Sequence, residues 1–287
     1  MNIPQNTVVI GLCVYNNEFG LPFVFENIRT LKQVLSVTKI IICYDHSSDN
    51  SLKIIEDEIR KSPDEFILIQ NQNLKSHHRT ENISNARNMI LNKIREMFSE
   101  TKYMIMMDSN EYSCVGKIQI DPIRSVLLRE SEWDAISFDR DAGYYDHWAL
   151  SFNPFIYSFF HFPNFQPVVA KLREIFGKIL SDYKTFKPDE YIPVYSAFNG
   201  FSIYKWETFK YCNYSSNINL SLFPSDIIQK QIDIVNQPII QQYKNDCEHR
   251  HFHLQGINER NAKIRICTKS VFAKFEGKLP SNCRGPA

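Results

Sequence analysis

Glycine is scarce in this chain, with only 9 among 287 residues. Neither GxGxxG nor GxxxxGKS/T occurs in the sequence. Both phosphate-binding loops need glycine for close backbone approach, so a Rossmann dehydrogenase and a P-loop NTPase are disfavoured. The charges nearly balance, with 33 Lys and Arg against 32 Asp and Glu, and this predicts no general nucleic-acid or anionic-membrane partner. Any anion that the protein binds must therefore be held by local groups.

Paired cysteines and long apolar runs are also missing. The 7 cysteines are scattered without a CxxC, and Cys13, Cys43 and Cys267 lie inside apolar runs, as small core residues do. This pattern predicts a reduced, cytoplasmic protein rather than a disulfide scaffold. No apolar run approaches the ~18 residues of a membrane-spanning helix, and Met1–Val9 lacks the pattern of a signal peptide. We therefore expect no membrane span.

Short apolar runs alternate with amphipathic segments in the first 110 residues. This alternation predicts a parallel, doubly wound α/β sheet flanked by helices. We expect strands over residues 7–14, 39–44, 65–70 and 103–108, and helices over 22–35, 51–61 and 82–98. The second half is less regular, with strands expected at 134–138, 195–204, 247–254 and 262–275 and a helix around 168–180. Within 195–204, we expect Asn199 and Gly200 to form a turn or bulge. The chain is interpreted as a single domain, 1–287, with halves 1–112 and 113–287.

The most informative segment is the apolar run Tyr103–Met107, which is followed directly by Asp108, Ser109, Asn110 and Glu111. A run so short and apolar indicates a strand buried on both faces. Ligands of open α/β sheets bind beyond the carboxyl ends of such strands. Oxygen ligands at this position suit Mg²⁺ or Mn²⁺ carrying a substrate diphosphate, although a plain polar turn would use the same residue types.

Two further strand ends carry acids, in Asn16–Glu18 and in Asp45–Asp49. Parallel strands would place all three polar clusters at one edge of the sheet. Asp45 could accept hydrogen bonds from a ribose hydroxyl or a base N–H, whereas Asp49 could equally cap the following helix. The three clusters together predict a binding cleft.

Arg79 and Arg87 lie near the start of the long helix expected at 82–98. A helix amino end favours anions, and arginine adds planar donors for phosphate or carboxylate. The alternative is that each arginine is an ordinary solvated surface residue.

An acidic, aromatic loop follows in the second half. Aromatic rings stack on the apolar face of a sugar, carboxylates bind its hydroxyls, and one carboxylate could act as a general base. The alternative is a surface loop held by aromatic packing. The residues concerned are Asp139, Asp141, Tyr144, Tyr145, Asp146 and Trp148.

Three histidines alternate in Glu248–His253. On a strand, His249, His251 and His253 would share one face, and three imidazoles on one face suggest a metal site. They would span about 13 Å by strand rise, which is too far for one ion. One histidine joined by ligands from elsewhere is the better prediction, and a partly exposed basic strand is the alternative.

The order of these motifs resembles a known family. The segments Val9–Glu18, Tyr44–Ser51 and Asp108–Asn110 resemble the nucleotide-sugar half of glycosyltransferases with the GT-A fold. Arg79 with Ala86–Asn88 is similar to capsule-associated mannosyltransferase-like members. Glycosyltransferases of giant DNA viruses are similar in Tyr144–Leu150, Phe198–Tyr204 and Cys247–His249. The resemblance spans most of the chain.

The resemblance implies a GT-A type, Rossmann-like, mostly parallel sheet with an irregular acceptor-side half. It implies transfer of a sugar from a UDP- or GDP-sugar to a glycan or glycoprotein hydroxyl, in the host cytoplasm if the protein is viral. The implied donor-site residues are Tyr15, Asn16, Glu18, Asp45, Arg79, Arg87, Asp108 and Ser109. Mn²⁺ or Mg²⁺ would be held by Asp108, Asn110 and His253 (or His251). Acceptor-binding residues would be Asp139, Tyr145, Trp148 and Asn199.

The mechanism implied is glycosyl transfer with the metal and Arg87 stabilising the departing diphosphate. If the anomeric centre inverts, Asp146 or Glu248 takes the acceptor proton, whereas retention needs no such base. Asn110 departs from the family pattern, where a second acid is expected, and its amide is a weaker metal ligand. A non-catalytic carbohydrate-binding or assembly protein is therefore an alternative. A nucleotidyltransferase would need a basic, glycine-rich loop, which Tyr15–Gly20 does not offer.

Overall fold

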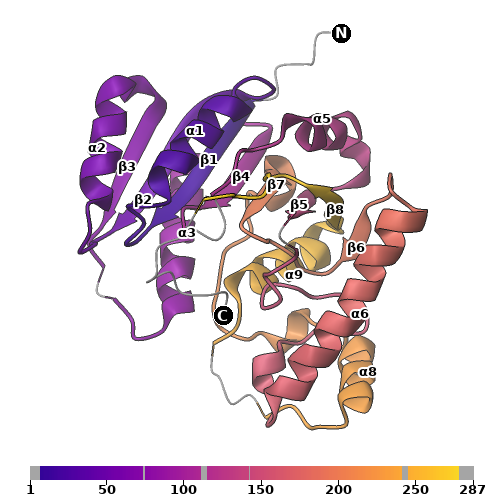
Figure 1. The fold of residues 1–287 in the computed structure, drawn as a ribbon. Helices are drawn as coiled ribbons and strands as arrows, with labels where there is room; N and C mark the ends of the chain where they lie inside the picture. The colour runs from indigo at the N-terminus through magenta and orange to yellow at the C-terminus, as the bar shows by residue number, and fades with distance from the viewer. Residues whose placement is uncertain (1–6, 74, 111–114, 142, 241–244, 278–287) are drawn as a thin grey trace.

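The computed structural model describes residues 7–73, 75–110, 115–141, 143–240 and 245–277. Its centre is an eight-stranded sheet of order β3-β2-β1-β4-β7-β5-β8-β6 (Figure 1). The first half contributes β1 (Thr7–Val14), α1 (Leu21–Leu31), β2 (Ser36–Asp45), α2 (Ser51–Lys61), β3 (Phe66–Asn71), α3 (Arg79–Met97) and β4 (Tyr103–Asp108). The second half contributes α5 (Ile120–Leu128), β5 (Ala135–Asp139), α6 (Phe165–Phe186), β6 (Ile192–Val194), β7 (Phe201–Lys205), α7 (Trp206–Phe209), α8 (Ser225–Val235), α9 (Glu248–Arg260) and β8 (Ile264–Ser270).

The predicted α/β class with a mostly parallel, helix-flanked sheet is confirmed. Strand β1 runs parallel to β2 and β4, β2 runs parallel to β3, and β5 runs parallel to β8. Strand β7 is antiparallel to both β4 and β5, and β6 is antiparallel to β8. Because β7 lies between β4 and β5, it joins the two halves of the chain into one sheet.

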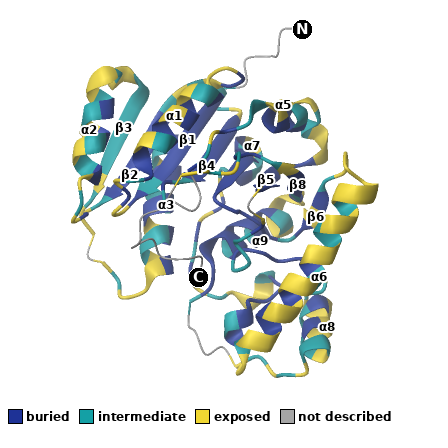
Figure 2. Cartoon of the chain, viewed as in Figure 1, coloured by how far each residue is buried: buried dark blue, intermediate teal, exposed yellow. Residues whose placement is uncertain are grey.

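Apolar side chains on both faces explain why the central strands are buried. On β4, Tyr103, Ile105 and Met107 face one core, which helices α1, α2 and α5 cover. Met104 and Met106 face the opposite core, which helices α3, α6 and α9 cover. Figure 2 shows the result, with buried strands and exposed outer surfaces on the helices. Such burial on both faces is what a short, continuous apolar run predicts.

One prediction about secondary structure is wrong in kind. The alternating segment at 247–254 is not a strand but the start of helix α9. Most of the first turns of α9 are buried, on all sides of the helix, so no amphipathic stripe marks it in the sequence. The helix ends at Asn261, which adopts a left-handed conformation with φ of 54°.

The strand predicted at 195–204 is also corrected. Strand β6 ends at Val194, and β7 begins only at Phe201. Between them, Asn199 and Gly200 have φ of 55° and 84°, a left-handed conformation that a strand does not adopt. The resulting turn delivers the backbone to the end of β4, because the Asp108 N–H donates to the Gly200 carbonyl at 3.0 Å.

Other boundaries shift by a few residues. Helix α1 ends at Leu31 rather than at residue 35, and α3 begins at Arg79 rather than at residue 82. Helix α6 extends over 22 residues, beyond the span predicted at 168–180. In the described part of the chain, no helix is long and apolar enough to cross a membrane.

Candidate active site

The acid-bearing ends of the first strands lie at one edge of the sheet. In the register of the sheet, Cys13 pairs with Cys43 on β2 and with Asp108 on β4. Asp45 ends β2, and Asp108 ends β4, so one strand separates them. Two strand spacings correspond to roughly 10 Å. The sequence-based expectation that Asp45 and Asp108 belong to a common edge agrees with this arrangement.

The loops after β1 and β2 hold each other through polar side chains. Asn16 Oδ1 accepts the Ser48 N–H at 2.8 Å. Glu18 Oε2 accepts the backbone N–H of Asn50 at 3.0 Å, and the Glu18 N–H donates to Asp49 at 2.9 Å. Asn16 and Glu18, both predicted to bind the donor, therefore have an evident structural role in fixing the two loops.

An exposed aromatic ring and an acid lie beside these loops. The Tyr15 ring is 53% exposed, and Lys75 Nζ lies 3.7 Å from the ring centroid. Asp45 is partly buried and accepts a hydrogen bond from Asn71 Nδ2 at 2.7 Å. A flat exposed ring and an oriented carboxylate are suitable for stacking and for hydrogen bonding to a base or ribose. Arg79, another predicted donor residue, is exposed in the first turn of α3.

The most concentrated polar cluster surrounds Arg87, on the buried face of α3. Its guanidinium is 4% exposed and donates to Asp108 Oδ1 at 3.1 Å through Nη2. Its Nη1 contacts both Glu248 and His249, which begin helix α9. Phe198 and Tyr214 flank the guanidinium, with their ring centroids 4.8 and 5.4 Å from its central carbon. Residues predicted separately as donor-binding and catalytic thus meet at the end of β4.

The neighbouring acids keep the Arg87 guanidinium charged. Burial alone would lower the pKa of Arg87, but Glu248 and Asp108 outweigh it and raise the pKa. The buried guanidinium is therefore a permanent positive charge beside two carboxylates. Removing either partner would leave part of that charge unpaired in a dry environment, which is costly.

Ser109 and Asn110 point in different directions from the end of β4. Ser109 is buried, and its hydroxyl lies 2.7 Å from both the Cys13 carbonyl and Asn17 Oδ1. This contact fastens β4 to the loop after β1, so Ser109 has an evident structural role. Asn110 Nδ2 lies 3.5 Å from Asp108 Oδ2. Glu111, which follows, lies outside the described residues.

Asp146 is held in the same neighbourhood by the turn before β7. Its Oδ2 accepts the Asn199 N–H, and its Oδ1 accepts the Ala149 N–H, both at 3.2 Å. Asn199 Oδ1 in turn accepts the N–H groups of Tyr145 and Asp146 at 3.2 and 3.3 Å. Asn199 is 2% exposed, so the structure places it behind Asp146 as a support rather than on a surface that an acceptor could reach.

The environment of Asp146 raises its pKa to about 6. Burial is the largest cause, and the negative charges of Asp108 and Glu248 add to it. The N–H donors from Ala149 and Asn199 oppose the shift without cancelling it. A carboxyl group with a pKa near neutrality can accept a proton from a hydroxyl more readily than an ordinary aspartate can.

The remaining predicted acceptor residues do not form one surface. Asp139 is 1% exposed and paired with Lys184 of α6, so it serves the packing of that helix. Trp148 is partly buried and packs edge-on against Phe160, with centroids 5.6 Å apart. Tyr145 is partly exposed and adjoins Asp146, with the Arg140 guanidinium carbon 5.7 Å from its ring centroid. Tyr145 is therefore the aromatic residue best placed beside Asp146.

His249 and His253 are buried near the start of α9 and His251 is partly buried, and their placement differs from the predicted common face. His249 and His253 are one turn apart with ring centroids at 5.7 Å, whereas His251 lies on another side of the helix. His253 Nδ1 lies 3.0 Å from Ser196 Oγ, and its Nε2 lies 3.2 Å from the Tyr204 hydroxyl. Burial lowers the pKa of His253 to about 3, so the ring is neutral.

These contacts do not fit the predicted metal centre well. One Asp108 oxygen is shared with Arg87, and both nitrogens of His253 are near hydrogen-bond partners. In residues 7–73, 75–110, 115–141, 143–240 and 245–277, no three His, Cys, Asp or Glu side chains form a group that could hold a metal ion. The three-ligand centre of Asp108, Asn110 and His253 stays a prediction.

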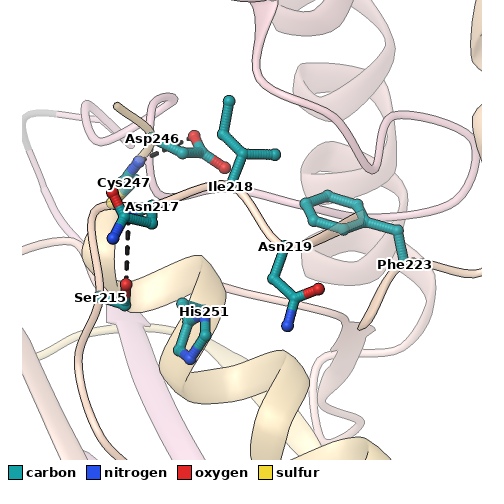
Figure 3. Close-up of a pocket in the computed structure, with 8 residues that line it drawn as sticks. All are labelled: Ser215, Asn217, Ile218, Asn219, Phe223, Asp246, Cys247 and His251. Atoms are coloured by element: carbon teal, nitrogen blue, oxygen red, sulfur yellow. Dashed lines mark hydrogen bonds between the residues drawn. The ribbon is translucent and has the colours of Figure 1, made fainter. Parts of the chain in front are cut away.

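A separate small cavity lies at the amino end of α9 (Figure 3). Its volume is about 10 Å³, which is room for roughly one water molecule. It is therefore no site for a nucleotide-sugar. The residues that line it are Ser215, Asn217, Ile218, Asn219, Phe223, Asp246, Cys247 and His251.

Sequence reasoning did not single out His249, Phe198 or Tyr214 as neighbours of Arg87. His249 stands more than 160 positions from Arg87 in the chain, so no local spacing connects them. Asn71, the partner of Asp45, was missed for a simpler reason. Polar residues at strand ends are common, and only the register of β2 with β3 places these two side by side.

No family model matches the chain, and no curated protein matches its sequence. Several solved structures have a similar fold. TarS 1–349 of S. aureus in complex with UDP-GlcNAc has a TM-score of 0.46 and 13% identity, over 95% of this chain and 60% of that one. The mannosyltransferase PcManGT of Pyrobaculum calidifontis, in complex with GDP-Man and Mn²⁺, has a TM-score of 0.43 and 11% identity, over 90% and 56%. Glucosyl-3-phosphoglycerate synthase of Mycobacterium tuberculosis, with Mn²⁺, UDP and phosphoglyceric acid, has a TM-score of 0.37 and 10% identity, over 71% and 57%. The chain thus spans about three fifths or less of these structures' lengths.

Proposed function

We propose that this chain is a glycosyltransferase that moves a sugar from a UDP- or GDP-sugar to a hydroxyl of a glycan or glycoprotein. The observation that carries the proposal is that Asp108 and Glu248 both contact the buried guanidinium of Arg87, while Asp146 lies near enough to both carboxyl groups for their charges to raise its pKa. The motif order that resembles GT-A enzymes of giant viruses and capsule synthesis supports the same conclusion.

The donor would lie across the ends of β1, β2 and β4. Tyr15 would stack on the base, and Asp45 would accept a hydrogen bond from the base or ribose. The diphosphate would then lie toward Asp108, where Arg87 supplies positive charge. A permanent charge in a low-dielectric setting stabilises the leaving diphosphate more than an exposed one would.

The acceptor step would use Asp146 as the general base. Its carboxylate takes the proton of the acceptor hydroxyl while that oxygen bonds to the anomeric carbon. The bond between the anomeric carbon and the diphosphate breaks, and the nucleoside diphosphate leaves with the electron pair. This assignment predicts inversion at the anomeric carbon. Glu248 is the weaker candidate for the base, because it is buried and paired with Arg87.

A divalent metal on the diphosphate remains part of the family resemblance, in which Mn²⁺ or Mg²⁺ would neutralise the diphosphate. The described side chains do not make a metal-binding group, so the proposed roles of Arg87 and Asp146 do not depend on a metal. The alternative function, a non-catalytic carbohydrate-binding or assembly protein, is favoured by Asn110, which stands where the family has a second acid.

Isothermal titration of the full chain with UDP-GlcNAc and with GDP-mannose, with and without Mn²⁺, tests the proposal. We expect binding of at least one nucleotide-sugar, together with slow release of free sugar over hours. If neither nucleotide-sugar binds under any of these conditions, the result would favour the alternative function. Nucleotide binding that is unchanged by Asp108→Ala would contradict the placement of the diphosphate.

A further inference from the structure

His249 is an unusual residue in the cluster because it is a neutral acceptor beside a buried cation. It is the second residue of α9 and is 1% exposed. Its ring stacks on Phe198 with centroids 3.8 Å apart, and Tyr214 meets it edge-on at 5.3 Å. This packing fixes the plane of the imidazole, so the direction of its nitrogens is fixed as well.

The contact with Arg87 determines which nitrogen of His249 carries the proton. Arg87 Nη1 contacts His249 Nε2. A guanidinium has only N–H donors and no acceptor, so Nε2 must be the nitrogen with the lone pair. The ring proton is then on Nδ1.

A second layer of contacts supports this tautomer. His249 Nδ1 lies 3.5 Å from the hydroxyl of Tyr204, a residue of β7 that is fully buried. The same hydroxyl lies 3.2 Å from His253 Nε2. Tyr204 is thus held between two imidazoles one helical turn apart, and its oxygen can accept the Nδ1–H of His249. These side chains link the middle of the sheet to Arg87.

We propose that His249 is a positioning residue that aims the Arg87 guanidinium at the end of β4, through its Nδ1-protonated tautomer backed by Tyr204. Without His249, Arg87 Nη1 keeps Glu248 as a partner but loses the acceptor that defines its plane. Among the residues that the structure describes, Arg87 Nε is buried with no hydrogen-bond partner, so the guanidinium has little tolerance for a further unpaired N–H. The consequence for the donor rests on the proposed function, whereas the tautomer does not.

The tautomer can be measured without any substrate. The full chain is labelled with ¹⁵N-histidine, and the His249 signals are assigned by their loss in His249→Gln. We expect a protonated Nδ1 and an unprotonated Nε2 at pH 7. A proton on Nε2, or a doubly protonated ring at pH 7, would overturn the proposal. In Tyr204→Phe, we expect the fraction with a protonated Nδ1 to fall.

Donor affinity provides the second test, with UDP-GlcNAc and GDP-mannose as probes. In His249→Gln, the side-chain amide oxygen can replace Nε2, so we expect affinity within about 3-fold of wild type. In His249→Phe, which keeps the ring packing but offers no acceptor, we expect a loss of 10-fold or more. Glu259→Gln, at an exposed position of α9, is the control and should bind like wild type.

The outcomes separate this inference from the proposed function. If the wild-type chain binds no nucleotide-sugar, the proposed function fails, and the tautomer measurement still decides the assignment of His249. If wild type binds but His249→Phe binds equally well, the positioning role fails while the function stands. Should His249→Phe not fold, donor affinity is compared between His249→Gln and His249→Ala. Weaker binding by His249→Ala than by His249→Gln would support the positioning role, and equal binding would overturn it.

Discussion

The two halves of the molecule hold their polar groups in different ways. In the first half, the polar ends of β1 and β2 are tied by contacts between adjacent loops, such as Asn16 with Ser48 and Glu18 with Asn50, and these residues are partly or fully exposed. In the second half, Asp146 and Arg250 are held by contacts from buried positions distant in the chain. The first half is built from local loop contacts, and the second depends on buried charge.

Arg250 shows how strongly the second half depends on one such charge. It is 1% exposed and pairs with Asp246 Oδ2 at 2.8 Å. Its guanidinium also donates to backbone carbonyls of the segment after Asp146, including those of Trp148 and Leu150. One side chain of α9 therefore shapes the loop that begins at Asp146.

The largest predicted effect is the loss of stability in Arg250→Met. Burial raises the pKa of Asp246, and Arg250 is the main group that lowers it below its usual range. Without Arg250, a buried carboxylate loses its compensating charge, which costs on the order of 3–5 kcal/mol. Urea unfolding at pH 7 measures this cost.

The matched control lies in the first half, where the exposed Arg60 pairs with Asp57, whose side chain is 43% exposed. We expect Arg60→Met to change the free energy of unfolding by no more than about 1 kcal/mol, because exposed ion pairs contribute little. Equal effects of the two substitutions would contradict the difference between the halves.

The next effect concerns activity in the second half. If Asp146 is the base, Asp146→Asn should lower kcat by roughly 10²- to 10⁴-fold, with donor affinity kept within about 3-fold. The base must be ionised, and its pKa is about 6. In the wild type, kcat/KM should therefore rise with pH through about 6 and level off above 7. A flat profile from pH 5 to 8, measured as transfer of radiolabelled sugar, would argue against Asp146.

The same pKa has a consequence for folding. The native state binds the Asp146 proton more tightly than the unfolded chain does, whose aspartate pKa is about 3.9. As pH rises between these two pKa values, the native state holds more protons, and the contribution of Asp146 to stability falls. Ionised Asp146 is thus stabilised less by the fold than neutral Asp146.

The first half could be predicted from sequence because its signals are local. Apolar runs ending at Asp45 and Asp108 marked strands, and parallel pairing placed their ends at one edge. The second half was harder to predict. Helix α9 is buried on several sides, so its sequence shows no apolar stripe with helical spacing. Asn199 was predicted to bind the acceptor, yet its left-handed backbone and its hydrogen bonds to Tyr145 and Asp146 hold the Asp146 loop instead. Contacts across fifty residues or more leave no spacing pattern to recognise.

The smallest predicted effect belongs to the exposed first half. If the Tyr15 ring stacks on the donor base, Tyr15→Ala should weaken UDP binding by about 1 kcal/mol, or roughly 5-fold, as stacking contacts on a single base do. Tyr15→Phe keeps the ring and should bind as wild type does. Tyr211, exposed to a similar degree in the second half, is the matched control, and Tyr211→Ala should leave affinity unchanged. Because Tyr15 is exposed, its loss should barely alter stability, so a fall in affinity would report on binding alone. Equal affinity of Tyr15→Ala and wild type would show that the nucleobase does not stack on this ring. Asp45 would then be the remaining recognition group at this edge of the sheet.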